Sequence, residues 1–128
     1  MVSTQRPSVL VVDDEPQVVW ILEFSLQGEG YETFSAHDGM EALDQVRRHH
    51  PDLMVLDVMM PRMDGWSVLE ALGTMPASER PRVVMVTALA SASDRERAER
   101  LGAEAFVPKP FDMDHLVGVL QGFSALAS

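Results

Sequence analysis

The 128-residue sequence contains no cysteine, so it can form neither a disulfide framework nor a thiolate metal site. It also has no apolar run approaching the roughly 20 residues that a membrane-spanning helix needs. The N-terminal segment from Met1 to Pro7 lacks the apolar core of a signal peptide. Together these absences predict a soluble cytoplasmic protein with no membrane association.

Basic residues are also scarce. Ten lysines and arginines stand against 20 aspartates and glutamates, which gives a formal net charge of −10. Because proteins bind nucleic acids largely by neutralising phosphates, this balance argues against direct nucleic-acid binding through a broad basic surface. A basic protein partner or a cation fits the charge better.

The size and composition of the chain are those of one ordinary globular domain, with 46% hydrophobic and 23% charged residues. There is no internal repeat, low-complexity tract or linker. We therefore expect a single domain over residues 1–128, with a core covering about 8–123.

Short apolar runs alternate with stretches of helical periodicity. The predicted strands are Ser8–Val12, Tyr31–Ala36, Leu53–Leu56, Arg82–Thr87 and Ala103–Pro108. The predicted helices run from Pro16 to about Gly28, from Asp38 to about His49, from Asp64 to near Met75, from Ser91 to Leu101, and from Asp112 past Phe123. Five such βα units predict an α/β fold, a parallel sheet with helices on both faces and right-handed crossovers. The flavodoxin-like strand order 2-1-3-4-5 would make the first and third strands neighbours.

Local signals give finer expectations for two of the helices. In the first, Asp14 or Glu15 is expected to act as the N-cap, and Trp20 and Phe24 to be partly buried beside the apolar stripe. That stripe consists of Val18, Ile21, Leu22 and Leu26. In the helix Ser91–Leu101, Ser93 and Glu96 predict a capping box. This helix has few large apolar residues, with Ala98 and Leu101 the main inward candidates, so we expect it to be weakly packed.

Polar residues stand where the predicted strands end. Asp13 and Asp14 follow the first strand, Asp57 the third and Lys109 the fifth, and Thr87 ends the fourth. In a parallel sheet these ends share one edge, where α/β proteins bind ligands. For Asp57 alone, a cap of the next helix is the other interpretation.

Three carboxylates at one edge repel each other and raise each other's pKa. A hard divalent cation held by oxygens offsets this, and Mg²⁺ fits best because it needs few carboxylates and leaves room for a phosphate. Lys109 adds an ammonium and Thr87 a hydroxyl. These are the groups that phosphoryl transfer requires, and a carboxylate such as Asp57 can itself be the nucleophile.

Four motifs at these strand ends resemble a response-regulator receiver domain. They are Val11-Val12-Asp13-Asp14-Glu15-Pro16, Leu56-Asp57-Val58-Met59-Met60-Pro61-Arg62-Met63-Asp64-Gly65, Val86-Thr87-Ala88 and Phe106-Val107-Pro108-Lys109-Pro110-Phe111. The resemblance covers roughly Ser8 to Phe123. It implies a switch that accepts a phosphoryl group, with slow self-catalysed chemistry rather than true enzyme activity.

The resemblance also implies a role for each matching residue. Asp57 would take the phosphoryl group from the phosphohistidine of a sensor histidine kinase or a phosphotransfer protein. Mg²⁺ would be held by Asp13, Asp14, Asp57 and the backbone carbonyl of Met59. Thr87 and Lys109 would bind the phosphoryl oxygens. Phe106 would be the switch aromatic, without the hydroxyl of a tyrosine, and Lys109-Pro110 a cis peptide.

The expected output is a changed surface over the last two helices and the strand between them, which would bind a downstream protein or a second copy of the chain. Two alternatives remain. A Mg²⁺-dependent phosphohydrolase of the haloacid-dehalogenase type would need a second acid two residues after its nucleophile, and the adjacent Asp13-Asp14 pair lacks that spacing. An unphosphorylated scaffold is disfavoured by the intact residue set. Whether the native chain continues past Ser128 into an effector domain stays open.

Overall fold

The computed structural model describes residues 6–89 and 91–127 of the chain. The strands are β1 (Ser8–Val12), β2 (Glu32–Ala36), β3 (Leu53–Leu56), β4 (Arg82–Thr87) and β5 (Ala105–Pro108). The helices are α1 (Pro16–Gly28), α2 (Gly39–His49), α3 (Gly65–Leu72), α4 (Ala92–Arg100) and α5 (Met113–Ala127), with a short 3₁₀ turn at Ala77–Glu79 that the sequence did not predict.

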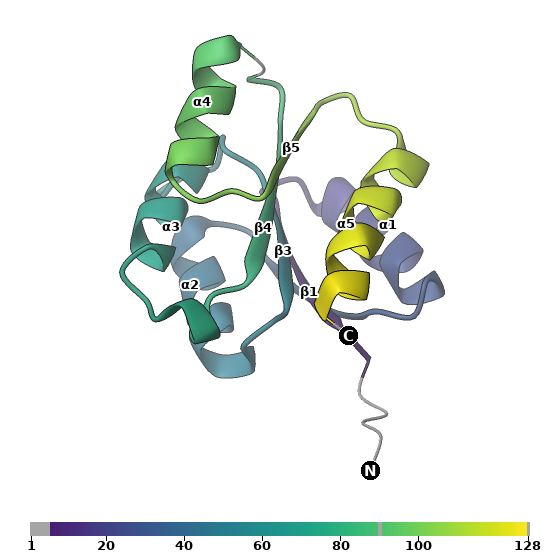
Figure 1. The fold of residues 1–128 in the computed structure, drawn as a ribbon. Helices are drawn as coiled ribbons and strands as arrows, with labels where there is room; N and C mark the ends of the chain where they lie inside the picture. The colour runs from purple at the N-terminus through teal and green to yellow at the C-terminus, as the bar shows by residue number, and fades with distance from the viewer. Residues whose placement is uncertain (1–5, 90, 128) are drawn as a thin grey trace.

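The strands form one parallel sheet in the order β2-β1-β3-β4-β5, which confirms the predicted α/β fold and strand order. In this order β3 lies between β1 and β4, with Val55 paired to Val11 on one side and to Val84 on the other. β2 is an edge strand, in line with its more polar sequence. Figure 1 shows α2, α3 and α4 on one side of the sheet and α1 and α5 on the other.

Strand residues alternate between two cores because successive side chains point to opposite faces of a sheet. Leu10, Met54 and Met85 pack with apolar residues of α2 and α3. Their neighbours Val9 and Val55 pack with residues of α1 and α5 on the other face. The central strands are therefore buried on both sides, as their continuous apolar runs predicted.

Two of the predicted helix caps are corrected by the structure. α4 begins at Ala92, so its capping box is formed by Ser91 and Asp94 and not by Ser93 and Glu96. For α1, Glu15 occupies the N-cap position but its side chain makes no capping bond. The Glu15 N–H instead donates to the Asp13 carboxylate over 2.9 Å. This bond turns the chain out of β1.

The buried stripe of α1 also differs from the prediction. Val19 is buried, whereas Ile21 is 48% exposed. Trp20 and Phe24 are 65% and 67% exposed, so the expectation of partial burial was wrong. Their rings stack on each other with centroids 5.4 Å apart, and each covers part of the other without help from the core. The stripe that contacts the sheet is narrower than the run of apolar residues.

Among residues 6–89 and 91–127, no helix has both the length and the apolar character required to cross a membrane.

Candidate functional site

The predicted site residues lie together at the C-terminal edge of the sheet, and the backbone holds them there. Sheet hydrogen bonding continues one residue beyond the strands. The N–H of Asp57 donates to the carbonyl of Val12 over 3.0 Å, and the N–H of Lys109 to that of Thr87 over 2.8 Å. These residues are therefore positioned by the sheet itself.

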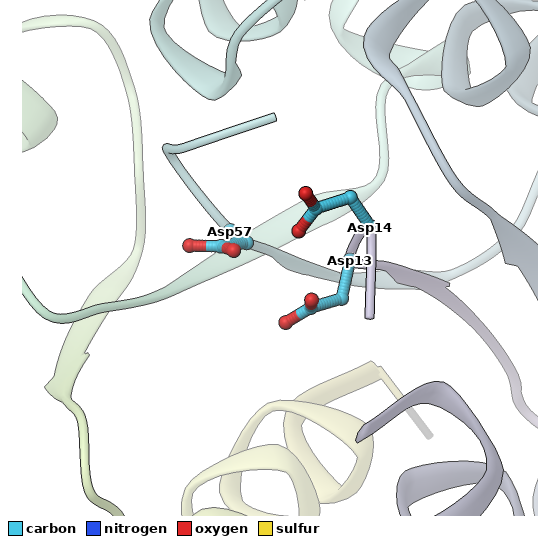
Figure 2. A group of neighbouring side chains, drawn as sticks. All are labelled: Asp13, Asp14 and Asp57. Carbon is cyan, nitrogen blue, oxygen red and sulfur yellow. The ribbon is translucent and has the colours of Figure 1, made fainter. Parts of the chain in front are cut away.

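Three carboxylates converge at the ends of β1 and β3. One oxygen each of Asp13, Asp14 and Asp57 lies within 4.8 Å of the others. Asp13 and Asp57 are buried, while Asp14 faces solvent. Figure 2 shows the side chains of Asp13 and Asp14 extending to the side on which Asp57 lies. An all-oxygen, anionic donor set with one open side fits a hard cation such as Mg²⁺.

Lys109 links two of these carboxylates. Its ammonium Nζ lies 2.9 Å from Oδ2 of Asp13 and 3.4 Å from Oδ2 of Asp57. Burial acts to lower the pKa of Lys109, but the hydrogen bond that its ammonium donates to Asp13 and the attraction of both carboxylates outweigh burial, so the pKa is raised. Lys109 therefore stays cationic at neutral pH. The Lys109-Pro110 peptide is cis, as the sequence resemblance implied.

The environment of Asp57 disfavours its charge. Burial raises the pKa of this carboxyl, the Lys109 ammonium acts in the opposite direction, and the Asp13 carboxylate raises it further. The net pKa lies above its ordinary value. Asp57 is thus an under-compensated carboxylate, which gains from any additional positive charge placed beside it.

The loop from β3 to α3 closes tightly around Asp57. The Met59 N–H lies 3.4 Å from Oδ1 of Asp57, and the Gly65 N–H donates to the carbonyl of Val58 over 2.8 Å. A Cβ on Gly65 would collide with the Asp57 carbonyl oxygen, so only glycine fits there. The Met59 side chain is 61% exposed, and together with Asp14 it lines a cavity beside the site.

Thr87 and Phe106 lie on the other side of Asp57. Thr87 is fully buried at the end of β4, and its hydroxyl oxygen accepts a hydrogen bond from the Leu89 N–H over 3.1 Å. The hydroxyl also carries a hydrogen that it can donate. Phe106 on β5 is half-buried, and the Arg95 guanidinium of α4 lies 4.9 Å from its ring centroid. The described residues thus include every predicted site residue, all near this edge.

Three arginine contacts near the site were not predicted from the sequence. Besides Arg95, the Arg97 guanidinium lies 4.4 Å from the ring centroid of Trp66. Arg62 in the β3–α3 loop lies 2.6 Å from the buried carboxylate of Asp38. These partners are distant in sequence, so no local spacing signals them.

Comparison with known proteins gives one consistent result. Residues 9–121 match the family model described as "Response regulator receiver domain". Among curated proteins, a "Probable transcriptional regulator ycf27" of Porphyridium aerugineum is 44% identical over 112 residues, which is 88% of this chain and 45% of that protein. A protein of the same description from Cyanophora paradoxa is 44% identical over 111 residues, 87% of this chain and 45% of that protein. The chain thus spans less than half the length of these relatives.

Solved structures give the same result. The receiver domain of the Francisella response regulator 1452 superposes with a TM-score of 0.88 at 29% identity, covering 95% of this chain and 99% of that chain. The chemotaxis response regulator CheY4 of Vibrio cholerae superposes with a TM-score of 0.85 at 29% identity, covering 93% and 99%.

Proposed function

The chain belongs to the response-regulator receiver family of two-component signalling, and we propose that it is a switch phosphorylated on Asp57. The observation that carries this proposal is the position of Asp57. It ends the central strand, with its pKa raised by burial and with a shared ammonium and two neighbouring carboxylates beside it. The charge pattern suits a nucleophile that receives a phosphoryl group.

In the proposed reaction a carboxylate oxygen of Asp57 forms a bond to phosphorus. The bond between phosphorus and the imidazole nitrogen of a donor phosphohistidine breaks at the same time, and its electron pair stays on the imidazole. The Lys109 ammonium lies 3.4 Å from Oδ2 of Asp57. We expect it to form an ion pair with an oxygen of the phosphoryl group attached there. The Thr87 hydroxyl donates to another phosphoryl oxygen in this proposal.

The proposal includes Mg²⁺, held by Asp13, Asp14, Asp57 and the backbone carbonyl of Met59. The oxygen-only donor set within 4.8 Å supports this choice, and receiver domains bind Mg²⁺ at their acidic pocket. When bound, the ion supplies positive charge against the phosphoryl oxygens.

Partners follow from the family and from the relatives. We expect a sensor histidine kinase or a phosphotransfer protein as donor, in the cytoplasm. We propose that the surface formed by α4, β5 and α5 then binds a downstream protein or a second copy of the chain. Any DNA binding would belong to another part of a longer protein, since this chain covers only 45% of a relative described as a "Probable transcriptional regulator". The net charge of −10 supports assigning no nucleic-acid contact to this domain.

A phosphohydrolase remains the alternative from another class. In this chain the residue two positions after Asp57 is Met59, which is not an acid. Asp57 therefore lacks the spacing that such an enzyme uses. Asp13 and Asp14 are directly adjacent. Asp13 has an acid two residues later, but that residue, Glu15, is exposed and is not one of the three clustered carboxylates. An unphosphorylated scaffold is disfavoured because Lys109 contacts both buried carboxylates, an arrangement with a chemical use.

The first prediction tests the phosphoacceptor. Incubation with acetyl phosphate and Mg²⁺ is expected to give one phosphoryl adduct by intact mass, and Asp57→Asn is expected to abolish it. Asp44→Asn, which removes an exposed acid paired with Arg48, serves as the control and keeps the adduct. An adduct that persists in Asp57→Asn, or that forms equally well in EDTA, would contradict the proposal.

A further inference from the structure

A salt bridge outside the acidic cluster ties the β3–α3 loop to the start of α2. Nη2 of Arg62 donates to Oδ2 of Asp38 over 2.6 Å. The Asp38 side chain is only 6% exposed, whereas that of Arg62 is 75% exposed. The loop therefore sends an arginine over the surface to reach a buried carboxylate 24 residues earlier in the chain.

Asp38 uses its two oxygens for different purposes. Oδ1 accepts from the Glu41 N–H over 2.8 Å and caps α2, while Oδ2 receives Arg62. The backbone hydrogen bond from Glu41 lowers the pKa of Asp38, burial opposes this, and the Arg62 charge lowers the pKa further. Asp38 is therefore ionised at neutral pH and presents a full charge to the loop.

The next residue strengthens the attachment. The Gly39 N–H donates to the Met63 carbonyl over 3.1 Å, and a Cβ on Gly39 would lie 2.6 Å from that same oxygen. Arg62 itself has φ +66°, in the left-handed region that is strained for residues other than glycine. The contacts made by Asp38 and Gly39 hold the loop in a shape that it would not favour alone.

We propose that Asp38, Gly39 and Arg62 are positioning residues that fix the β3–α3 loop and thereby set the affinity of the acidic site for a divalent cation. This inference rests on the proposed function, because the Met59 carbonyl is the loop's assigned ligand. The route is short, since Met59 stands three residues before Arg62 and its N–H already lies 3.4 Å from the Asp57 carboxylate.

The physical reason is preorganisation. A free loop must be ordered when its carbonyl binds a cation, and that entropy cost weakens binding. A loop already held by Asp38 and Gly39 avoids most of this cost. Residues that orient metal ligands without touching the metal typically change its affinity by about 10- to 100-fold.

The sign of the effect separates this proposal from simple electrostatics. Removing the Arg62 charge makes an already acidic protein more negative, which by Coulomb's law should strengthen cation binding. Loss of positioning should weaken it. Arg48→Gln is a matched control because it removes the same charge from an exposed pair, Arg48–Asp44, on the helix that Asp38 caps.

Mg²⁺ binding is to be measured by fluorescence in a Trp20→Phe background. Trp66 is then the only tryptophan, and it lines a cavity together with Asp14 and Met59. The Mg²⁺-induced rise in melting temperature gives a second readout. We expect Arg62→Gln to raise the Mg²⁺ dissociation constant about tenfold, and Arg62→Lys to restore part of the affinity. Because Arg62 is largely exposed, its replacement leaves no buried cavity.

Asp38→Asn separates the loop contact from the helix cap, because asparagine still accepts from the Glu41 N–H. This variant is expected to weaken Mg²⁺ binding as Arg62→Gln does. Phosphorylation by acetyl phosphate should return to the wild-type rate at saturating Mg²⁺ in both variants, which general damage to the fold would not allow. Equal Mg²⁺ affinity in Arg62→Gln and Arg48→Gln would overturn the positioning role. A wild-type chain that binds no Mg²⁺ would instead overturn the proposed function.

Discussion

Helices α3 and α4 lie on the same side of the sheet, and each follows a loop of the candidate site, yet they are held in different ways (Figure 1). The buried residues of α3 include Trp66, Leu69 and Leu72. In α4 only Ala98 is buried, although that helix has nine residues and α3 has eight. The sheet therefore anchors α3 by apolar packing and α4 by very little of it.

α4 is held instead by arginine guanidinium groups that lie over aromatic rings. Arg97 lies over Trp66 and Arg95 over Phe106. At exposed positions such contacts are worth about 0.5–1 kcal/mol each. They break at small cost, whereas the core contacts of α3 do not. One loop of the site therefore precedes a firmly packed helix, and the other precedes a helix that a local change can move.

The contrast is tested most strongly by shortening one buried side chain in each helix. Leu69→Ala in α3 is expected to lower the free energy of unfolding by about 3 kcal/mol, because it leaves a cavity in the core. Ala98→Gly, at the one buried position of α4, is expected to cost about 1 kcal/mol. Urea unfolding at constant pH measures both. Similar losses in the two variants would remove the distinction between the helices.

Hydrogen exchange with and without beryllium fluoride and Mg²⁺ tests which helix responds. We expect protection to change across residues 91–106, because α4 has few contacts to lose and Phe106 can turn when Thr87 engages the added group. The amides of α3 should change less. Changes confined to the surroundings of Asp57 would show that the signal does not leave through α4.

The pH dependence of stability tests how strongly the buried charge of Asp57, in the loop before α3, opposes folding. The pKa of Asp57 is raised in the folded state, so the fold binds its proton more tightly than the unfolded chain does. The ordinary pKa of an aspartate is 3.8. The stability that Asp57 contributes is therefore fully present below pH 3.8 and falls as the pH rises through the raised pKa of Asp57 in the folded state. In EDTA, Asp57→Asn should melt at a higher temperature than wild type at neutral pH.

The difference in melting temperature between Asp57→Asn and wild type should shrink as the pH falls toward 3.8, the ordinary pKa of aspartate. Glu96→Gln on the exposed face of α4 is the control, and it should change the melting temperature little at either pH. An Asp57→Asn variant that is less stable than wild type at neutral pH would mean that the attraction of Lys109 outweighs burial.

The smallest expected effect concerns the lifetime of the phosphorylated state. Met59 and Leu89 stand two residues after Asp57 and Thr87, and their exposed apolar side chains cannot hold an attacking water by a strong hydrogen bond. Met59→Asn is expected to hydrolyse about fivefold faster, the equivalent of one hydrogen bond of about 1 kcal/mol. Loss of radiolabelled phosphate over time measures this rate. Slower hydrolysis in the variant would contradict the assignment.

Much of the fold and of the site was predictable from sequence because both depend on where strands end. Apolar runs as distinct as Leu53–Leu56 have one interpretation, and the strand order brings Asp13, Asp57 and Lys109 to one edge. The surface of α1 was not predictable, because Ile21 and Val19 are equally apolar and only the position of the sheet decides which is buried. The same limit hid the contacts of Arg62 and Arg95, whose partners lie far away in sequence.

The central place of β3 has a consequence for energetics. Asp57 meets β1, with its acidic pair, on one side and β4, with Thr87, on the other, so both sides act on a single residue. Thermodynamic linkage is reciprocal. A partner that binds the α4 surface more tightly after phosphorylation must, by the same coupling free energy, favour the phosphorylated state of Asp57. If the chain is phosphorylated on Asp57 as proposed, binding of such a partner would increase the phosphorylated fraction, and the concentration of the partner would help to determine how fully a given donor phosphorylates the chain.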